Sequence, residues 1–379
     1  MSKMRNRIDP IHSVEVTMDS ESVGTLVLTP GNVCAFQYHA DYLRKGVSIS
    51  PFHLPLTSSL YLAESTPFRG NFGVFDDSLP DGWGNLVLDR YLRSKQVDPN
   101  ALSVMQRLCF VGESGRGALC YLPDHSPDIT NAGFDFEEFR REAEQLFASS
   151  DYIGENMEAL YCYGGSSGGA RPKAFVTIDG REWMVKFPNS ADPKDVGKIE
   201  YEYSLLAKAC GIEMAETKLF EDRYFGVARF DRAGDKRIHT VSAAGILHAD
   251  YRMPSIDYTS LLLACNQLSR NLKETEKLFR LMVFNVVISN RDDHAKNFSF
   301  QLMDGNWRCA PAYDLLPSYG FGGWHTTTIN GSGDPKMNDI LAVAKTAGIS
   351  ENIARSIVHE VRMECRNAKK EKIILEQEE

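Results

Sequence analysis

Apolar and polar residues alternate with a period of two along the first part of the chain, the pattern of half-buried strands. "SVEVTM" (13–18) alternates strictly, and "GTLVLTPGNVCAFQYH" (24–39) is rich in β-branched and aromatic residues. "SLPDGWGNLVLDRYLRSK" then opens with turn residues and continues as a helix, and "GESGRGALCYLPD" returns to a short strand. Residues 1–125 are therefore predicted to form a small α+β unit.

A polar, turn-rich stretch, "DHSPDITNAGFD", leads from this unit to an amphipathic helix and a second group of strands. "AFVTIDGREWMVKFP" holds two alternating runs around Asp179 and Gly180, the strongest short-range signal for a β-hairpin. A helix ended by Gly211 and two further strands in "ETKLFEDRYFGVARFD" follow. Together they predict a second domain, residues 126–235.

From residue 236 the periodicity is helical almost to the C-terminus, and the apolar run Leu278–Ile288 predicts a central buried helix. The tail "NAKKEKIILEQEE" is expected to be a solvated helix end. The predicted fold class is thus α+β and protein-kinase-like: a small mixed part with β-hairpins and one helix, then a mostly α-helical lobe, residues 236–379. Such enzymes hold ATP in the cleft between two lobes, which makes a kinase a hypothesis to test on the residues.

Composition narrows the classes of function. The 379 residues carry 42 Lys and Arg against 51 Asp and Glu, and a net charge of −9 argues against broad nucleic-acid binding. No apolar run reaches the length of a membrane span and the N-terminus lacks a signal-peptide core, so a cytoplasmic protein is expected. The eight cysteines include no CxxC pair, which favours reduced, mostly buried thiols over a zinc site or disulfides.

Charged and amide side chains gather directly after the apolar run, in "SNRDDHAKNFSF" (289–300). Asp292 and Asn297 have the D-x-x-x-x-N spacing of a kinase catalytic loop, in which the carboxylate meets the acceptor hydroxyl and the amide oxygen reaches the metal. Asp314, in "PAYDLLPS", is placed like the aspartate of a DFG segment that bridges magnesium to the phosphates. Asp292 is therefore predicted to be catalytic, and Asn297 and Asp314 to bind Mg²⁺.

Two further residues of this loop are assigned to the nucleotide. His294 could pass for a general base, but its place in the loop favours a ring that ties the loop together. Lys296 could contact the γ-phosphate of ATP.

Phosphoryl transfer also needs a lysine and a backbone cradle for the phosphates. Lys186 lies on the second strand of the predicted hairpin, where a buried lysine needs a counter-charge from Glu200 or Glu202. "YGGSSGGARPKAFV" (163–176) stands directly before that hairpin and offers glycines for close approach to phosphates, with Arg171 and Lys173 for charge. It matches neither GxxxxGK[ST] nor GxGxxG, which disfavours a Walker-type NTPase. Singly, such a loop or lysine is more often structural; their order and spacing together favour a kinase.

At these residues the chain resembles the HipA family of bacterial serine/threonine kinases, the toxins of toxin–antitoxin pairs. The resemblance is carried, in order, by "FDDSLPDGWG", "VGESGRGALCYLP", "SSGGARPKA", "EYEYSLLAKACGI", "VARFDR", "NRDDHAKNFSF" and "AYDLLPS". It implies the roles already given to Asp292, Asn297 and Asp314. It further implies a phosphate loop and a hinge that holds adenine and ribose largely through backbone groups, so the nucleotide-binding residues are expected to be Gly168, Gly169, Ala170, Arg171, Lys173, Lys186, Ala228, Phe230 and Asp231.

The resemblance also implies regulation and partners. Family members are switched off by phosphorylation of a phosphate-loop serine, which matches Ser166 here, with Ser167 as a rival. A small helix-turn-helix antitoxin (HipB-like) is expected to bind the toxin in a heteromeric complex and to supply the DNA contact. Glutamyl-tRNA synthetase is the best-known family target, so an aminoacyl-tRNA synthetase or another translation protein is a candidate substrate.

Two other functions stay open. A catalytically idle, kinase-like co-repressor would bind the antitoxin without needing all of Asp292, Asn297, Asp314 and Lys186. A small-molecule phosphotransferase would share the D-x-x-x-x-N arrangement, and it is distinguished by whether phosphate reaches a metabolite or a protein.

Overall fold

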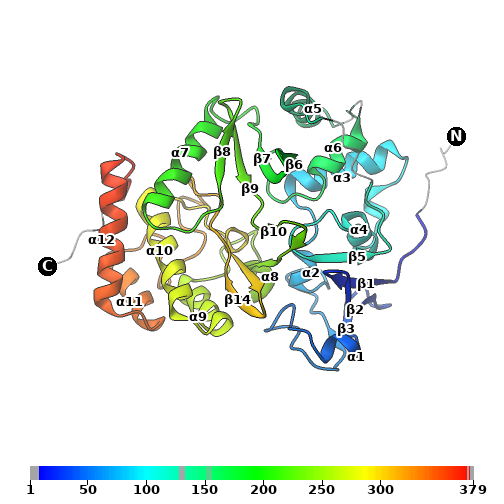
Figure 1. The fold of residues 1–379 in the computed structure, drawn as a ribbon, viewed down its shortest axis with the longest axis horizontal. Helices are drawn as coiled ribbons and strands as arrows, with labels where there is room; N and C mark the ends of the chain where they lie inside the picture. Colours follow the sequence, from blue (N-terminus) through cyan, green and yellow to red (C-terminus); the bar gives the residue numbers. More distant parts are fainter. Residues whose placement is uncertain are drawn as a thin grey trace. The chain divides into compact units, whose positions relative to one another are not determined.

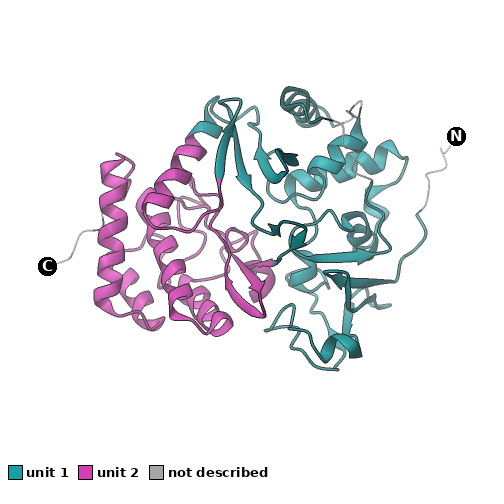
Figure 2. Ribbon diagram, viewed as in Figure 1, with its two compact units in different colours: residues 1–198, 217–239 teal, residues 199–216, 240–379 magenta. Residues whose placement is uncertain are grey.

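The computed structural model describes residues 8–127, 133–150, 152, 154, 156–373 and 375. It divides into two compact units (Figure 2): unit 1 consists of residues 1–198 and 217–239, and unit 2 of residues 199–216 and 240–379. Both predicted domains that precede residue 236 therefore contribute to unit 1, while 199–216 belongs with the C-terminal part. The predicted linker contains residues 128–132, which lie outside the described part of the chain.

The first sheet of unit 1 is antiparallel and has the strand order β4-β3-β2-β1-β5 (Figure 1). Val14 and Val16 of β1 are buried between exposed neighbours, which confirms the alternation seen in the sequence. The strands are β1 Ser13–Met18, β2 Glu21–Leu28, β3 Cys34–Tyr38, β4 Tyr61–Leu62 and β5 Leu119–Leu122.

The helices of unit 1 contribute to an apolar core that also includes the second sheet. Trp83, in the first turn of the third helix, is fully buried in this core with Val87 and Tyr161. A capping box between Ser103 and Gln106 starts the fourth helix. The helices are α1 Ala40–Leu43, α2 Gly73–Asp76, α3 Gly82–Ser94, η1 Pro99–Ala101 (3-10), α4 Val104–Val111, α5 Phe136–Ala148 and α6 Met157–Gly164.

The second sheet of unit 1 has the order β6-β7-β9-β8 and contains the predicted hairpin. Asp179 and Gly180 both have positive φ, 52° and 74°, as a type I′ turn requires. Its strands are β6 Lys173–Ile178, β7 Arg181–Lys186, β8 Thr217–Phe220 and β9 Tyr224–Ala228, and the short pair β10 Arg232–Ala233 and β11 Lys236–Arg237 follows.

Unit 2 is built around α10, Leu272–Ile288, whose residues from Leu278 onward are mostly buried; this confirms the predicted central helix. This part is mostly helical, as predicted, but it also contains the three-stranded sheet β12-β13-β14, which was not predicted from the sequence. The remaining elements are α7 Val196–Ala209, which begins in unit 1, β12 His239–Ser242, α8 Ala243–Leu247, α9 Tyr258–Ser269, η2 Ala295–Asn297 (3-10), β13 Ser299–Met303, β14 Asn306–Cys309, α11 Met337–Thr346 and α12 Glu351–Asn367.

The C-terminal tail differs from the predicted solvated helix end. Helix α12 stops at Asn367, and the chain then turns so that Lys372 N–H and Ile373 N–H donate to Val287 O, at 2.9 and 3.2 Å. Leu375 is buried. The tail thus satisfies a carbonyl in the last turn of α10, which has no partner within its own helix.

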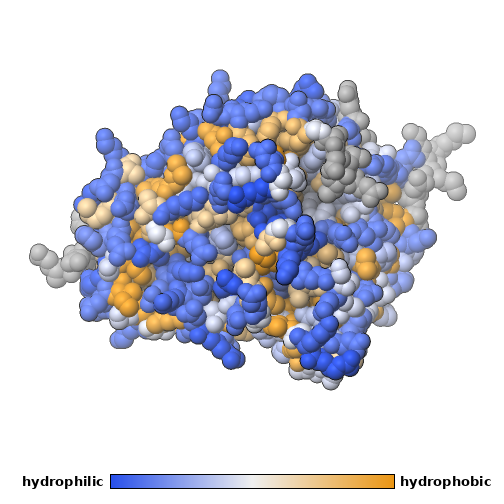
Figure 3. Space-filling model, viewed as in Figure 1, coloured by the Kyte–Doolittle hydropathy of each residue, from blue (hydrophilic) through white to orange (hydrophobic). Residues whose placement is uncertain are grey.

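Hydrophilic and apolar residues are mixed at the visible surface (Figure 3), and most cysteines are buried. On the face shown in Figure 3, hydrophilic residues are interspersed with small apolar patches. Among the helices of the described residues, none is long and apolar enough to cross a bilayer. All eight cysteines are free thiols, and five of them are buried.

His239 gives the fold a dependence on pH. Burial lowers the pKa of His239 to about 4, although its Nε2–H donates to Ile49 O at 2.8 Å. The folded-state pKa lies below the ordinary value of 6.5, so as the pH falls protons bind the unfolded chain first, and stability is lost between about pH 6.5 and pH 4.

From pH 7 to pH 5 the free energy of unfolding should fall by about 2 kcal/mol less in His239→Gln than in the wild type, because glutamine binds no proton in this range. Urea denaturation at the two pH values measures this difference. The control is His359→Gln on the exposed side of α12. An equal pH dependence in wild type and His239→Gln would contradict the assignment.

Candidate functional site

Asp292 and Asn297 are joined directly in the loop after α10. The amide Nδ2 of Asn297 donates to Asp292 O at 2.6 Å, so its Oδ1 is the atom that can ligate a cation. Asp292 N–H donates to Ser318 Oγ at 2.8 Å, which fixes the residue on its other side. The Asp292 side chain is exposed and Asn297 is half-buried. The predicted catalytic carboxylate and metal amide are therefore held by one short, bonded loop.

The segment that carries Asp314 is tied to the same loop. Asn290 Nδ2–H donates to Asp314 O at 3.3 Å and to Asn285 Oδ1 at 3.1 Å, while Ser318 Oγ–H donates to Asn290 Oδ1 at 3.1 Å. Asp314 has φ 58°, a left-handed conformation in which Asp and Asn are enriched among non-glycine residues. Asn290 and Ser318 thus hold the chain segments of Asp292, Asn297 and Asp314 together.

The centre of this arrangement is Asp293, a residue to which the sequence interpretation gave no role. Its carboxylate is fully buried and accepts hydrogen bonds from four groups. These donors are Tyr258 Oη–H (2.9 Å), His325 Nδ1 (2.8 Å), Thr326 N–H (2.9 Å) and Thr327 N–H (3.2 Å). Burial and the nearby Asp293 carboxylate raise the pKa of Tyr258 well above its usual value, which keeps its hydroxyl proton available for this bond.

Lys296 and His294 complete the loop. His294 Nδ1 accepts from Lys296 N–H at 3.2 Å, as expected for a ring that ties the loop together. Lys296 is buried, with Nζ 4.0 Å from the ring centroid of Tyr251, and Tyr313 Oη–H donates to Lys296 O at 2.6 Å. A cation over an aromatic face is stabilised without losing its charge. A γ-phosphate contact of Lys296 stays a prediction.

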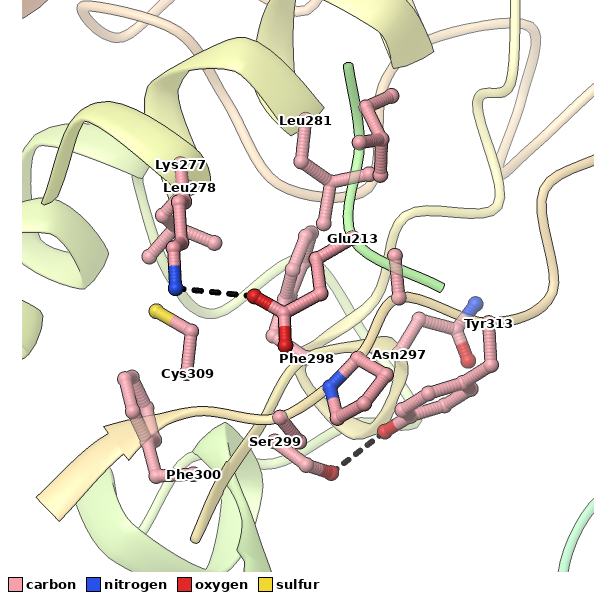
Figure 4. Close-up of a pocket in the computed structure, with 14 residues that line it drawn as sticks. Glu213, Lys277, Leu278, Leu281, Asn297, Phe298, Ser299, Phe300, Cys309 and Tyr313 are labelled. Atoms are coloured by element: carbon pink, nitrogen blue, oxygen red, sulfur yellow. Dashed lines mark hydrogen bonds and ion pairs between the residues drawn. The ribbon is translucent and has the colours of Figure 1, made fainter. Parts of the chain in front are cut away.

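Asn297 also lines a small pocket of unit 2 (Figure 4). It holds about 30 Å³ and is bordered by two bonds, Lys277 Nζ to Glu213 Oε2 at 2.9 Å and Ser299 to Tyr313 at 2.6 Å. A nucleotide needs a site of roughly 300 Å³ or more. This pocket therefore has room for a few waters only.

The serine- and glycine-rich loop of unit 1 connects α6 to β6 and is folded inward. Ser166 Oγ–H donates to Ser114 O at 3.0 Å, and Ser167 Oγ–H donates to Gly164 O at 2.7 Å; both side chains are buried. Lys173 Nζ donates to Gly168 O, and Arg171 pairs with Asp192 at 3.0 Å. The glycines predicted to approach phosphate are present in a closed, internally bonded loop.

Lys186 ends strand β7 opposite Lys173 and is buried, with Nζ 5.9 Å from the ring centroid of Phe225. Of its two predicted partners, Glu202 pairs with Lys370 at 3.0 Å. Glu200 is buried, so it is the better candidate; the pairing itself stays a prediction.

Of the predicted hinge residues, Ala228 ends strand β9, and Phe230 and Asp231 follow it. The Asp231 carboxylate accepts from Arg229 (2.7 Å), Arg232 (2.9 Å) and Gly117 N–H (2.9 Å). Burial opposes ionisation of Asp231, but Arg229 and Arg232 together hold its pKa well below its usual range. This side chain therefore serves the fold, and nucleotide contact here stays a prediction for backbone groups.

The oxygens of Asn297 and Asp314 suit Mg²⁺, which prefers carboxylate and amide oxygens. In the described residues, no group of three His, Cys, Asp or Glu side chains could hold a metal by itself. A magnesium ion at these residues would thus complete its coordination with waters and phosphate oxygens, as this ion commonly does.

We expect Asp293→Asn to lower the free energy of unfolding by about 3 kcal/mol, because one carboxylate oxygen becomes an NH₂ group facing buried donors. Urea denaturation measures the change. Asp334→Asn is the matched control: Asp334 lies 3.7 Å from Arg291 of the same loop, but its side chain is 51% exposed, so less than about 1 kcal/mol is expected. Equal effects of the two substitutions would show that Asp293 does not organise the loop.

Comparison with known proteins matches most of the chain to two domains of one family. Residues 14–122 match the HipA N-terminal domain and residues 165–369 the HipA-like C-terminal domain. "Putative kinase Y4dM" of Sinorhizobium fredii is 24% identical over 371 residues, covering 90% of this chain and 87% of that protein. "Putative kinase Y4mE" of the same organism is 31% identical over 130 residues, which cover 31% of this chain and 31% of that protein.

A solved structure shows the fold. HipA in the complex of the Shewanella oneidensis toxin–antitoxin system with HipB and operator DNA aligns with a TM-score of 0.69 at 17% identity, over 95% of this chain and 92% of that one. The fold is thus kinase-like. Since both family domains match in order along most of its length, the chain belongs to the HipA family.

Proposed function

We propose that this protein is an ATP- and Mg²⁺-dependent serine/threonine protein kinase that acts as the toxin of a toxin–antitoxin pair. The observation that carries the proposal is the bond from Asn297 to the main chain of exposed Asp292, in a loop tied to the Asp314 segment. A carboxylate and two oxygen ligands held in this way suit phosphoryl transfer, in which the protein mainly positions groups and stabilises charge.

Each side chain then has a defined task. Asp292 orients the acceptor hydroxyl and takes up its proton through the exposed carboxylate. Asn297 and Asp314 would hold magnesium, which when bound neutralises charge on the phosphates. Lys186 would contact the α- and β-phosphates, and Lys296 the γ-phosphate. His294 keeps Lys296 in place through its bond to the Lys296 amide.

The surroundings of Ser166 support the proposal that its phosphorylation regulates the protein. The Ser166 hydroxyl is buried and donates to Ser114 O. A phosphate ester on Ser166 cannot donate that bond, and its charge of about −1.5 to −2 cannot remain buried beside a carbonyl oxygen. Phosphorylation would therefore expel this part of the loop. Ser167, whose hydroxyl donates to Gly164 O, is the rival site.

The proposed partners are a HipB-like antitoxin and a protein substrate. The Shewanella complex contains HipA, HipB and operator DNA. A net charge of −9 on this chain is consistent with an antitoxin that makes the main contact with DNA. An aminoacyl-tRNA synthetase or another translation protein is the proposed class of substrate.

We expect purified protein with γ-labelled ATP and Mg²⁺ to incorporate label on the peptide that contains Ser166. Asp292→Asn should slow this transfer by roughly 10²–10⁴-fold while leaving ATP binding largely intact. Asp304→Asn is the control, because Asp304 is also in unit 2, at a turn with φ 51° and a 95% exposed side chain. Intact ATP binding without transfer to any protein would instead favour an idle co-repressor or a small-molecule phosphotransferase.

We expect Asp314→Asn to raise the Mg²⁺ concentration needed for transfer by about tenfold or more, because one anionic ligand becomes neutral. The left-handed backbone should persist, since Asn also adopts it. A magnesium titration of the transfer rate measures the change, and an unaltered midpoint would exclude Asp314 as a ligand.

A further inference from the structure

The closed serine- and glycine-rich loop is held by the first turn of helix α3. Asp81 stands at the N-cap of α3, but its carboxylate makes no capping bond to its own helix. It accepts instead from Gly169 N–H. In the same structure the N-cap aspartates Asp135 and Asp257 bind amides of the helices they begin, the usual arrangement. The Asp81 carboxylate thus binds an amide of the loop and none of its own helix.

The contact is reciprocal. Gly169 O accepts from Trp83 N–H at 2.8 Å, so the loop satisfies one of the amides that α3 leaves open at its start. The indole N–H of Trp83 donates to Lys173 O at 3.0 Å, at the other end of the loop. Trp83 is fully buried, which fixes these donors in position. We call the contacts of Asp81 and Trp83 with the loop the α3 clasp.

Two glycines allow this approach. A Cβ on Gly82 would lie 2.4 Å from Gly169 O, and one on Gly84 would lie 2.1 Å from Ser167 O. Both distances are far below van der Waals contact, and the opposing atoms are backbone, so they cannot move without moving the loop. The sequence Asp81–Gly84 is therefore shaped to receive the closed loop.

The groups expected to bind phosphate, the Gly169 amide and Lys173 Nζ, already have hydrogen-bond acceptors in the closed loop. The Gly169 amide already faces a carboxylate, and Lys173 Nζ donates to Gly168 O inside the loop. Asp81 Oδ1 would lie 3.1 Å from a Cβ on Gly168, so its negative charge sits at the loop's glycines. A phosphate of a nucleotide brought to these amides would replace Asp81 or be repelled by it.

We propose that Asp81 is a resident anion of the phosphate loop, which competes with the phosphates of the nucleotide and holds the loop closed until they displace it. This inference rests on the proposed function, because it takes residues 168–173 as the phosphate-binding segment. It gives the N-terminal part of unit 1 a role in setting nucleotide affinity, and it makes Asp81 a positioning residue.

The test compares Mg-ATP, Mg-ADP and adenosine binding by calorimetry in the wild type, Asp81→Asn and Asp135→Asn. Asp81→Asn keeps an oxygen for the Gly169 amide but removes the charge. We expect it to tighten ATP binding roughly three- to tenfold and ADP binding less, with adenosine unchanged, since the competition is with phosphate alone. Asp135→Asn makes the same substitution at the N-cap of α5 and should change none of the three.

Weaker ATP binding by Asp81→Asn, or an equal change for adenosine, would overturn the proposal. A second readout does not depend on nucleotide: amide hydrogen exchange in residues 167–171 should rise at least tenfold in Asp81→Ala and stay unchanged in Asp135→Ala. If no variant binds ATP but exchange rises as expected, the proposed kinase function fails and the clasp stands. Unchanged exchange in Asp81→Ala would refute the clasp, whatever the nucleotide binding.

Discussion

The buried carboxylate of Asp293 is the constraint on which the rest of unit 2 depends. A fully buried charge is tolerated only when its lone pairs are satisfied, and here the donors come from α9 and from the segment around residues 325–327. Satisfying Asp293 therefore fixes the position of its neighbour Asp292 relative to segments far away in sequence. The exposed residue proposed for chemistry is held in place by the buried residue next to it.

In unit 1, distant segments are joined by hydrogen bonds from side chains to backbone carbonyls. Three arginines, Arg229, Arg232 and Arg237, donate to carbonyls of residues 113–117, and Ser166 donates to a carbonyl in the same stretch. The loop "GESGRG" thus links the N-terminal sheet region with both the Ser/Gly loop and the end of β9. The sequence blocks around residues 81–84 and 112–117, which resemble the family's N-terminal part, are in direct contact with the loop assigned to phosphate binding.

Local patterns predicted local structure well. The Asp179–Gly180 hairpin, the buried helix α10 and the short spacing from Asp292 to Asn297 depend on neighbours in sequence, and each is present. The hairpin of β13 and β14 was not predicted, although Asp304 and Gly305 carry the same turn signal, with φ 51° and 76°. The roles of Asp293, His325 and Asp81 could not be predicted, since their partners lie 32 residues or more away. No local pattern reports such pairs.

The C-terminal tail links the site to the order in which the chain is made. Lys372 and Ile373 donate to Val287, one turn before the loop of Asp292, and His325 reaches back to Asp293. During synthesis from the N-terminus these bonds form only after residues 325, 372 and 373 have left the ribosome. A nascent chain that has not yet reached these residues lacks the contacts on both sides of the Asp292 loop, so this loop takes its final position later than helix α10, which precedes it in the sequence.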